Sequence, residues 1–308
     1  MQTVHAEAHG KIILIGEHSV VYQKGAIVAP FTQAFIDVEI QPSTGEITID
    51  SSYHQGFFFT RGVPIEGLQV LLKAFLEKYD LPAKNLHIKI TSNMLSRRGL
   101  GSSAAVAKAL AEALFKYFDI SYTRENLVES IQISELVYHA KPSGIDMNAV
   151  LSDDLLWYQA GKFSVIKTSF PLYLVVADSG EASQTKIAVL EVSERVKRDE
   201  KATLEAIETL GQLSLKAKDV LENGHVDDFA ELLNLAQTQL KTMGVSSAQL
   251  DHLIQLAIHH GALAAKLTGG GQGGCMFALF SSSSKCDNFV KLLKEQGVSQ
   301  TWIMKIGH

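Results

Sequence analysis

Residues 99–105 read Gly99-Leu100-Gly101-Ser102-Ser103-Ala104-Ala105, and they separate a strand pattern from a helix pattern. Upstream, Leu86, Ile88 and Ile90 alternate with polar residues, which predicts a half-buried strand. Downstream, residues 104–118 are apolar on almost every side, which predicts a buried helix. A helix start has backbone N–H groups without partners and the positive end of the helix dipole. The stretch is therefore a candidate anion-binding loop, although a glycine turn with a serine N-cap explains it equally well in isolation.

Two common nucleotide-binding signatures do not fit this chain. A Walker A loop needs Gly-Lys followed by a hydroxyl residue, and neither Gly10-Lys11 nor Gly161-Lys162 has one. The dinucleotide pattern G-x-G-x-x-G/A matches twice, from Gly99 and from Gly269. The first match is not followed by a second strand that ends in an acidic residue, and the second lies between two strand-like runs. These contexts argue against a dinucleotide-dependent oxidoreductase.

The composition is that of a globular protein large enough for two domains. The chain has 308 residues, of which 46% are hydrophobic. Its net charge of −5 argues against binding to nucleic acid or to an acidic membrane surface. The two cysteines, Cys275 and Cys286, have neither a disulfide nor a metal-site spacing. Because the sequence also has no membrane-spanning apolar run and no export leader, we expect a cytoplasmic protein.

The patterning predicts an α+β fold with a boundary near residue 180. In the first part, strands are expected over residues 12–15, 35–40, 47–50, 57–60, 86–90, 155–159, 163–167 and 172–177. Helices are expected over residues 67–79, 104–118, 124–140 and from 143. Charged amphipathic helices follow over residues 186–222 and 225–243. The chain then reads strand, strand, helix, strand, which suits a split βαβ sandwich, over residues 262–267, 275–280, 285–295 and 300–305.

Polar residues bracket the apolar strand near the N-terminus. Lys11 precedes this strand, and Glu17 and His18 follow it. Polar groups at the ends of a buried strand can converge on a cleft. Taken alone, Lys11 could equally be a solvated lysine, and His18 could equally be a hydrogen-bonded structural histidine.

A second polar segment runs from Glu135 to Asp146. Glu135 and His139 lie four residues apart on a predicted helix that Pro142 ends. A single glutamate suits a hard cation such as Mg²⁺ and does not form a zinc-protease site. On this segment alone, the Ser143-x-x-Asp146 spacing favours a helix-capping role for Asp146.

A third segment is unusually rich in glycine. Five glycines lie between Thr268 and Cys275. Ordering so many glycines costs much backbone entropy, which a simple hairpin turn does not explain. We expect a loop whose backbone must approach a ligand.

Together these segments resemble the GHMP kinases, the superfamily of galactokinase, homoserine kinase, mevalonate kinase and phosphomevalonate kinase. The resemblance covers nearly the whole chain and rests on three blocks in order: Lys-strand-Gly-Glu-His, Gly-Leu-Gly-Ser-Ser-Ala-Ala and Thr-Gly-x-Gly-x-Gly-Gly-Cys. Within the superfamily, residues 11–22, 142–146 and 301–303 are most similar to the mevalonate kinases. The resemblance implies an N-terminal mixed α/β domain like domain 2 of ribosomal protein S5 over residues 1–180. It also implies a C-terminal ferredoxin-like α/β sandwich over residues 181–308.

The resemblance also implies an activity and residue roles. The expected reaction, in isoprenoid precursor biosynthesis, transfers the γ-phosphoryl group of ATP to the primary hydroxyl of mevalonate and gives 5-phosphomevalonate. Asp146 would take the hydroxyl proton, Lys11 would be its cationic neighbour, and Glu17 and His18 would belong to the substrate site. Mg²⁺ would be the cofactor, with Ser103 and Glu135 as its ligands. The ATP phosphates would bind Gly99, Leu100, Gly101, Ser102, Ser103 and Ala104. The glycine loop, with Gly269, Gly271 and Gly273, would close over the cleft, and a homodimer is compatible with the family.

The sequence departs from the usual superfamily pattern in two places. His9 stands where proline is common before Gly10-Lys11, which we expect to alter only a turn. Arg97 and Arg98 stand where small residues are common, and we expect at least one of them to be solvated.

Several alternatives remain open. A phosphomevalonate kinase would need extra cationic side chains in its acceptor pocket, which one sequence does not reveal. A galactokinase is disfavoured because an acidic residue would be expected soon after Gly-Glu-His, where residues 19–22 read Ser-Val-Val-Tyr. A non-catalytic metabolite-binding protein is disfavoured by the joint presence of Lys11, Glu135 and Asp146.

Overall fold

The computed structural model describes residues 2–138, 144–183, 185–198 and 200–307. Its contacts divide the chain into two compact units, and neither unit is continuous in sequence. Unit 1 comprises Met1–Gly10, Ala34–Leu95 and Gly101–Asp153. Unit 2 comprises Lys11–Gln33, Ser96–Leu100 and Asp154–His308. The division of the chain near residue 180 stays a prediction.

Unit 1 contains a small mixed sheet. The residues from Ala34 onward in β2 (Ala26–Pro42) pair antiparallel with β5 (Leu86–Ser92), from Ile36 opposite Ser92 to Pro42 opposite Leu86. Strand β3 (Thr48–Asp50) adds parallel to β5, and β4 (Gln55–Phe57) adds antiparallel to β3. In β2 and β5, buried apolar residues alternate with more exposed ones, as expected for a sheet with one covered face.

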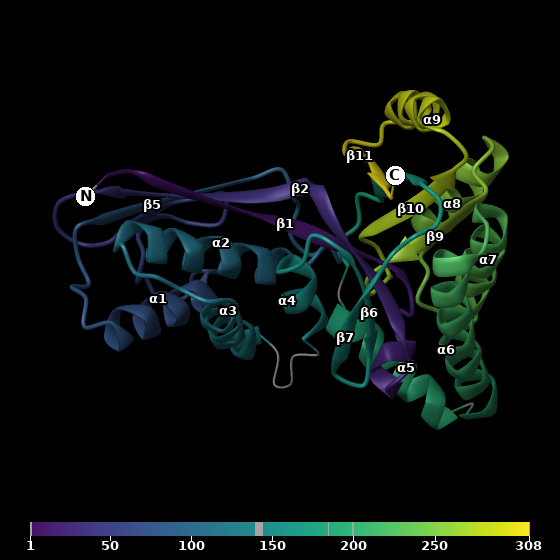
Figure 1. Cartoon of the computed structure of the whole chain (residues 1–308), viewed down its shortest axis with the longest axis horizontal. Coiled ribbons are helices and arrows are strands. Elements are labelled where there is room, and N and C mark those ends of the chain that lie inside the picture. Colours follow the sequence, from purple (N-terminus) through teal and green to yellow (C-terminus); the bar gives the residue numbers. More distant parts are fainter. Residues whose placement is uncertain (1, 139–143, 184, 199, 308) are drawn as a thin grey trace. The chain divides into compact units, whose positions relative to one another are not determined.

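Helices complete the core of unit 1 (Figure 1). They are α1 (Glu66–Lys78), α2 (Ser102–Tyr117), α3 (Arg124–Tyr138) and α4 (Ile145–Val150). Helices α2 and α3 each contact the other three. Alanines fill much of the buried surface of α2, which lets neighbouring helices approach closely. Between α1 and α2, the rings of Phe75 and Phe115 meet edge to face with centroids 4.9 Å apart.

Unit 2 is built on a four-stranded antiparallel sheet with the order β11-β8-β10-β9. Its strands are β8 (Leu172–Asp178), β9 (Ala264–Thr268), β10 (Cys275–Phe280) and β11 (Thr301–Ile306). The chain runs from β8 through helices to β9, β10, α9 (Ser283–Glu295) and β11, which is the ferredoxin-like arrangement. The expected split βαβ sandwich is thereby confirmed, and β8 is one of its two central strands.

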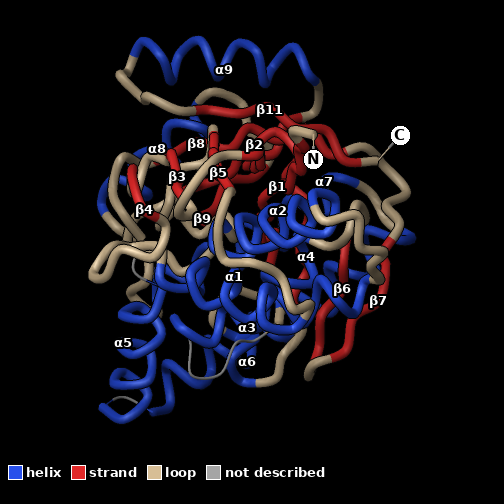
Figure 2. The backbone as a smooth tube through the Cα atoms, turned by 90° about the vertical axis from the view of Figure 1, so that its left-hand side faces the viewer, coloured by secondary structure: helices blue, strands red, loops and turns tan. Residues whose placement is uncertain are grey.

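Unit 2 contains further elements. Its other helices are α5 (Thr185–Arg198), α6 (Glu200–Asn223), α7 (Val226–Thr242) and α8 (Ala248–His259). Helices α7 and α8 pack on β9, and Figure 2 shows α9 lying along β11. The unit also holds the end of β1 (Val4–Ile15), the 3-10 helix η1 (Ser19–Tyr22), the start of β2, and the hairpin of β6 (Leu155–Gln159) and β7 (Lys162–Ile166).

Some elements differ from the sequence expectation. The strand expected over residues 57–60 is wrong, because Thr60 folds back and donates both its backbone N–H and its hydroxyl to the carbonyl of Phe57. Helix α8 was not expected, and β1 and β2 are longer than expected. Among the described residues, no helix combines the length and apolar character that crossing a membrane requires.

Candidate active site

The loop over residues 99–105 has the geometry of an anion-binding helix start. Gly101 is the N-cap of α2 with a φ of 74°, and no side chain caps the helix. The first helical hydrogen bond runs from the N–H of Ala105 to the carbonyl of Gly101 over 3.0 Å. The N–H groups of Ser102, Ser103 and Ala104 therefore have no acceptor within α2. The alternative of a serine N-cap is wrong, because glycine occupies that position in the left-handed conformation.

Gly99 and Gly269 bring two predicted site segments into direct backbone contact within unit 2. A Cβ atom added to Gly99 would lie 3.2 Å from the Cα of Gly269, and one added to Gly269 would lie 2.9 Å from the Cα of Gly99. Both residues also have a positive φ, of 77° and 82°. Glycine is required at both positions because any side chain would force the two backbones apart.

The glycine loop (residues 269–274) contacts several other segments of unit 2. The N–H of Gln272 donates to the carbonyl of Val245 over 2.7 Å, and a Cβ on Gly271 would lie only 2.1 Å from that oxygen. The hydroxyl of Ser183 donates to the carbonyl of Gly271 over 2.9 Å. Close backbone packing within the protein thus accounts for Gly271, and closure over a ligand stays a prediction.

Residues near the end of β1 form hydrogen bonds with the loop before α2 and with the last residue of β9. The N–H of Lys11 donates to the carbonyl of Leu100 over 2.9 Å. The hydroxyl of Thr268 accepts from the N–H of Ile13 over 2.9 Å and donates to the carbonyl of Ile13 over 3.0 Å. One side chain therefore satisfies both backbone groups of Ile13.

Glu17 forms a buried ion pair with Lys266. The Lys266 ammonium contacts a carboxylate oxygen of Glu17, donates to the carbonyl of Leu267 over 2.6 Å and lies 5.2 Å from the ring centre of Phe277. Both charged side chains have no exposed surface. Burial raises the pKa of Glu17, and the ammonium offsets part of that rise. Such a pair is costly to break, because removing one partner leaves an uncompensated buried charge.

His18 holds the glycine loop through a hydrogen bond. Its Nε2 lies 2.9 Å from the carbonyl oxygen of Gly270, and a carbonyl can only accept, so Nε2 carries the proton. The Nδ1 atom is buried and has no hydrogen-bond partner among the described residues. Burial lowers the pKa of His18, and the bond to Gly270 opposes part of that change. The imidazole is therefore neutral near pH 7, with an acceptor lone pair on Nδ1.

The two arginines before Gly99 differ in their surroundings. Arg97 is exposed, so the expectation that at least one of them is solvated is confirmed. The Nε of Arg98 lies 2.6 Å from a carboxylate oxygen of Asp178, which is buried at the end of β8. Arg98 is therefore an ion-pair partner and not a solvated cation.

The other predicted site residues lie on three helices of unit 1. Ser103 is in the first turn of α2, Glu135 is buried on α3, and Asp146 is half-buried in the first turn of α4. The N-cap of α4 is Gly144 with a φ of 75°, and no side chain caps the helix. Ser143, the other member of the predicted capping box with Asp146, lies outside the described residues, as do His139 and the predicted helix end at Pro142.

The donor chemistry of unit 1 fits a magnesium ion. Ser103 offers a hydroxyl and Glu135 a carboxylate, and Mg²⁺ prefers such oxygen donors while keeping water and phosphate oxygens as further ligands. Among the described residues, no group of three or more His, Cys, Asp or Glu side chains is arranged to hold a metal ion. A metal that needs only one protein carboxylate matches this donor set better than zinc does.

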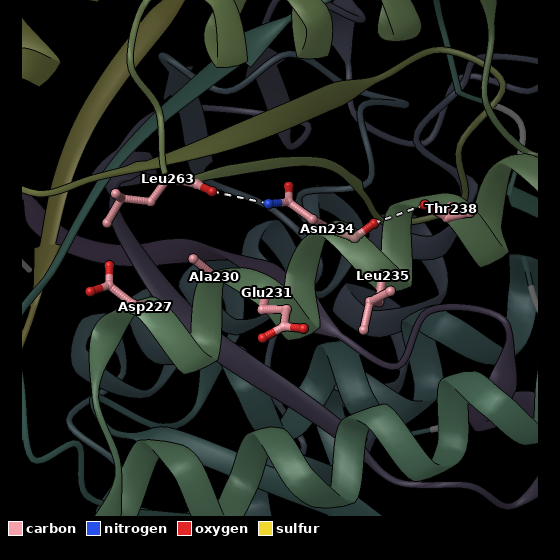
Figure 3. A pocket seen from close by; sticks show the side chains of 7 residues that line it. All are labelled: Asp227, Ala230, Glu231, Asn234, Leu235, Thr238 and Leu263. Atoms are coloured by element: carbon pink, nitrogen blue, oxygen red, sulfur yellow. Dashed lines mark hydrogen bonds between the residues drawn. The ribbon is translucent and has the colours of Figure 1, made fainter.

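Unit 2 also has a cavity beside α7 (Figure 3). It has a volume of about 390 Å³ and is lined by Asp227, Ala230, Glu231, Asn234, Leu235, Thr238 and Leu263. The amide of Asn234 donates to the carbonyl of Leu263 over 3.0 Å and thus joins α7 to the chain before β9. This contact is structural, and the cavity contains none of the predicted site residues.

Sequence patterns alone did not identify the partners of the predicted residues. Lys266 and Thr268 fill this role on β9, and Asp178 fills it at the end of β8. A signal was present, because each of these polar residues lies within or at the end of an otherwise apolar strand. Buried polar residues in such positions usually have a specific partner.

The sequence matches both domain models of one kinase family. Residues 67–153 match the family of GHMP kinases N terminal domains, and residues 217–298 match that of GHMP kinases C terminal domains. The chain belongs to the GHMP kinases.

Individual relatives and solved structures with high similarity to this chain are mevalonate kinases. A mevalonate kinase of Pyrococcus furiosus is 33% identical over 297 residues, which cover 90% of this chain and 89% of the relative. The structure of a mevalonate kinase from methicillin-resistant Staphylococcus aureus is 30% identical, covers 100% of both chains and has a TM-score of 0.77. An L. major mevalonate kinase in complex with R-mevalonate is 26% identical, covers 99% of this chain and 96% of its own, and has a TM-score of 0.82.

Proposed function

We propose that this protein is a mevalonate kinase, which transfers the γ-phosphoryl group of ATP to the primary hydroxyl of mevalonate. The observation that carries the proposal is the similarity to mevalonate kinases along nearly the whole chain, at 33% identity to one of them. The open helix start of α2 supports it, because three backbone N–H groups there have no acceptor within the helix.

In this proposal, the ATP phosphates bind at residues 99–104. The N–H groups of Ser102, Ser103 and Ala104 donate to phosphate oxygens, and the glycines at 99 and 101 allow the backbone to come close. The glycine loop, including Gly269, Gly271 and Gly273, lies against Gly99 and borders the nucleotide.

Magnesium belongs to the same proposal. Ser103 and Glu135 would hold the ion, and their oxygen donors fit it. When bound there, Mg²⁺ would supply positive charge that offsets the negative charge developing during transfer.

Asp146 and Lys11 serve the acceptor side. The Asp146 carboxylate accepts the proton of the mevalonate hydroxyl while that oxygen forms its bond to the γ-phosphorus. The bond from the γ-phosphorus to the bridging oxygen breaks, and ADP leaves with the electron pair. Lys11 stabilises negative charge on the transferring group, since phosphoryl transfer depends mainly on positioning and on charge stabilisation.

Glu17 and His18 belong to the substrate site in this proposal, although both side chains already have partners within the protein. Glu17 is paired with Lys266 and His18 is bonded to Gly270, so neither side chain is wholly available to a ligand. The Nδ1 of His18 is a buried acceptor suited to a hydroxyl donor.

A coupled ADP-release assay tests the function. The acceptors are mevalonate, phosphomevalonate, galactose and homoserine, each with and without Mg²⁺. We expect turnover with mevalonate only, and its loss when EDTA removes the metal. Turnover with phosphomevalonate instead would make the protein a phosphomevalonate kinase, and activity on none of the four would overturn the proposal.

Two further properties accompany this function. We expect the enzyme to act in the cytoplasm, where the two free, buried cysteines stay reduced. A homodimer is compatible with this function, and light scattering after size-exclusion chromatography will distinguish it from a monomer.

A further inference from the structure

Residues 96–100, which lead into α2, are enclosed by two other segments of unit 2. The N–H of Ser183 donates to the carbonyl of Arg97 over 2.7 Å. A Cβ on Gly274 would lie 2.9 Å from the carbonyl oxygen of Arg98, and Gly99 touches Gly269. The first half of the phosphate loop therefore rests on the backbone of the glycine loop and of the segment after β8.

One side-chain interaction fixes this arrangement. The Nε of Arg98 lies 2.6 Å from Oδ1 of Asp178 in an ion pair whose geometry is not that of a hydrogen bond, and the two side chains are 14% and 1% exposed. A second guanidinium nitrogen of Arg98 donates to the carbonyl of Gly180 over 3.4 Å. Asp178 ends the central strand β8 and lies opposite Cys275 in the register with β10. The ion pair thus connects the loop to the end of a central strand of the sheet.

The burial of Asp178 makes the loss of its partner costly. A carboxylate with almost no exposed surface depends on its partner, because an unpaired buried charge is costly. The pair therefore restrains the main chain at Arg98, immediately before Gly99. Arg97 has the same charge and is exposed, so it provides no such restraint.

We propose that Arg98 and Asp178 form a positioning pair for the phosphate loop. Arg98 acts through the backbone of Gly99 and Leu100 and is not itself a phosphate ligand. This inference rests on the proposed function in one respect, the assignment of this loop to the ATP phosphates. It differs from the expectation for a basic residue beside a phosphate site, which would be direct anion binding.

Nucleotide affinity measured without any acceptor tests the pair. A fluorescent ATP analogue, displaced by ATP in the presence of Mg²⁺, gives the dissociation constant for Arg98→Ala, Asp178→Asn and the double variant. We expect each single variant to weaken binding on the order of 10-fold, because small misplacements of binding groups have effects of this size or larger. The double variant should be no weaker than the worse single variant, since both changes remove one interaction.

Arg97→Ala is the matched control. It removes the same charge one residue away, and we expect it to bind ATP as the wild type does. Equal losses in Arg97→Ala and Arg98→Ala would overturn the proposal in favour of a general charge effect. Wild-type affinity in Asp178→Asn together with weak binding in Arg98→Ala would overturn it in favour of direct phosphate binding by Arg98.

Folding is monitored through the Tm of each variant. If Arg98→Ala does not fold, Arg98→Lys and Asp178→Asn decide the question. We expect the lysine variant to keep part of the wild-type affinity for ATP. Wild-type affinity in both of these would overturn the proposal. A wild-type protein that binds no nucleotide would instead overturn the proposed function, so the two failures are distinguishable.

Discussion

At the scale of single residues, Asp146 is the most direct test of the chemistry. We expect Asp146→Asn to lower kcat by at least ~10²-fold, the low end for loss of general acid–base catalysis. The affinity for ATP should stay near the wild-type value, because the change removes a proton acceptor and not a phosphate contact. Steady-state kinetics and nucleotide displacement measure the two quantities.

The nearby Asp153 provides a control for this variant, because its side chain is 99% exposed. Asp153→Asn should leave kcat unchanged. A near-normal kcat in Asp146→Asn would remove that carboxylate from the mechanism.

His18 makes the stability of the fold depend on pH. Burial lowers its pKa below the usual value of 6.5, so the unfolded chain binds a proton more readily than the folded one. Stability therefore rises with pH between the lowered pKa and about 6.5, and it is lost as the pH falls through that window. A tenfold difference in proton affinity between the folded and unfolded chain corresponds to about 1.4 kcal/mol of stability.

The variant His18→Gln cannot titrate, and we expect its stability to change less than that of the wild type between pH 7 and pH 5. Urea unfolding at several pH values measures the difference. His252→Gln, at an exposed histidine, is the control and should follow the wild type. Parallel pH profiles for His18→Gln and the wild type would contradict the assignment of a neutral buried imidazole.

At the scale of elements, the glycine loop can be tested by a matched pair of substitutions. Gly271 and Gly261 both have a positive φ, of 73° and 85°. An added Cβ would collide with the carbonyl of Val245 at Gly271, whereas at Gly261 it would meet nothing within 4 Å. Gly261→Ala should cost only the left-handed backbone strain of about 1–2 kcal/mol. Gly271→Ala should cost more, because the loop must also move.

The two variants should also differ in function. Gly271→Ala should raise the KM for ATP, and Gly261→Ala should leave it unchanged. Urea unfolding and ATP titrations give both results. Equal losses of stability in the two variants would show that the contact with Val245 does not constrain the loop.

Most elements could be predicted from periodicity, and the misses have physical causes. The strand before residue 99 and the helix after it follow directly from alternating and continuous apolar residues. The first half of β1 was missed because its buried positions are Ala6 and Ala8, which carry little hydrophobic signal. Helix α8 did show a signal, since Leu250, Leu253, Ile254 and Ala257 have helical spacing and are all buried.

The candidate site was only partly predictable for a different reason. Local sequence marked Glu17, His18 and the glycines, but their partners lie far away in the chain. Glu17 pairs with a residue 249 positions later, and His18 bonds to one 252 positions later. No periodic pattern encodes such pairs, because they depend on how β1 and β9 come together.

At the scale of the whole molecule, the two cysteines report on opening of the structure. Cys275 and Cys286 have no exposed surface. Burial raises the pKa of both thiols, that of Cys286 to about 12, so reactive thiolate is scarce. We expect Ellman's reagent to modify the native protein slowly and to modify two thiols at once after unfolding in urea.

The variant Cys286→Ala isolates the thiol beside the glycine loop. ATP at about 100 times its Kd should make the opened state roughly 100-fold rarer and slow the modification of Cys275 accordingly. Fast modification of the native protein, or a rate that ATP does not change, would contradict this expectation.

The hydroxyl of Thr268 that holds Ile13 has a consequence for biosynthesis. Its two bonds span 255 residues, and the strand segment around Ile13 belongs to a unit whose remaining parts come mostly from the second half of the chain. In a nascent chain, the backbone groups of Ile13 cannot make these two bonds until residue 268 has been translated. Contacts of such long sequence separation also slow folding, because the loop-closure entropy is lost before the contacts form. The segment that carries Lys11, Glu17 and His18 is thus translated well before the residues that complete its hydrogen bonds.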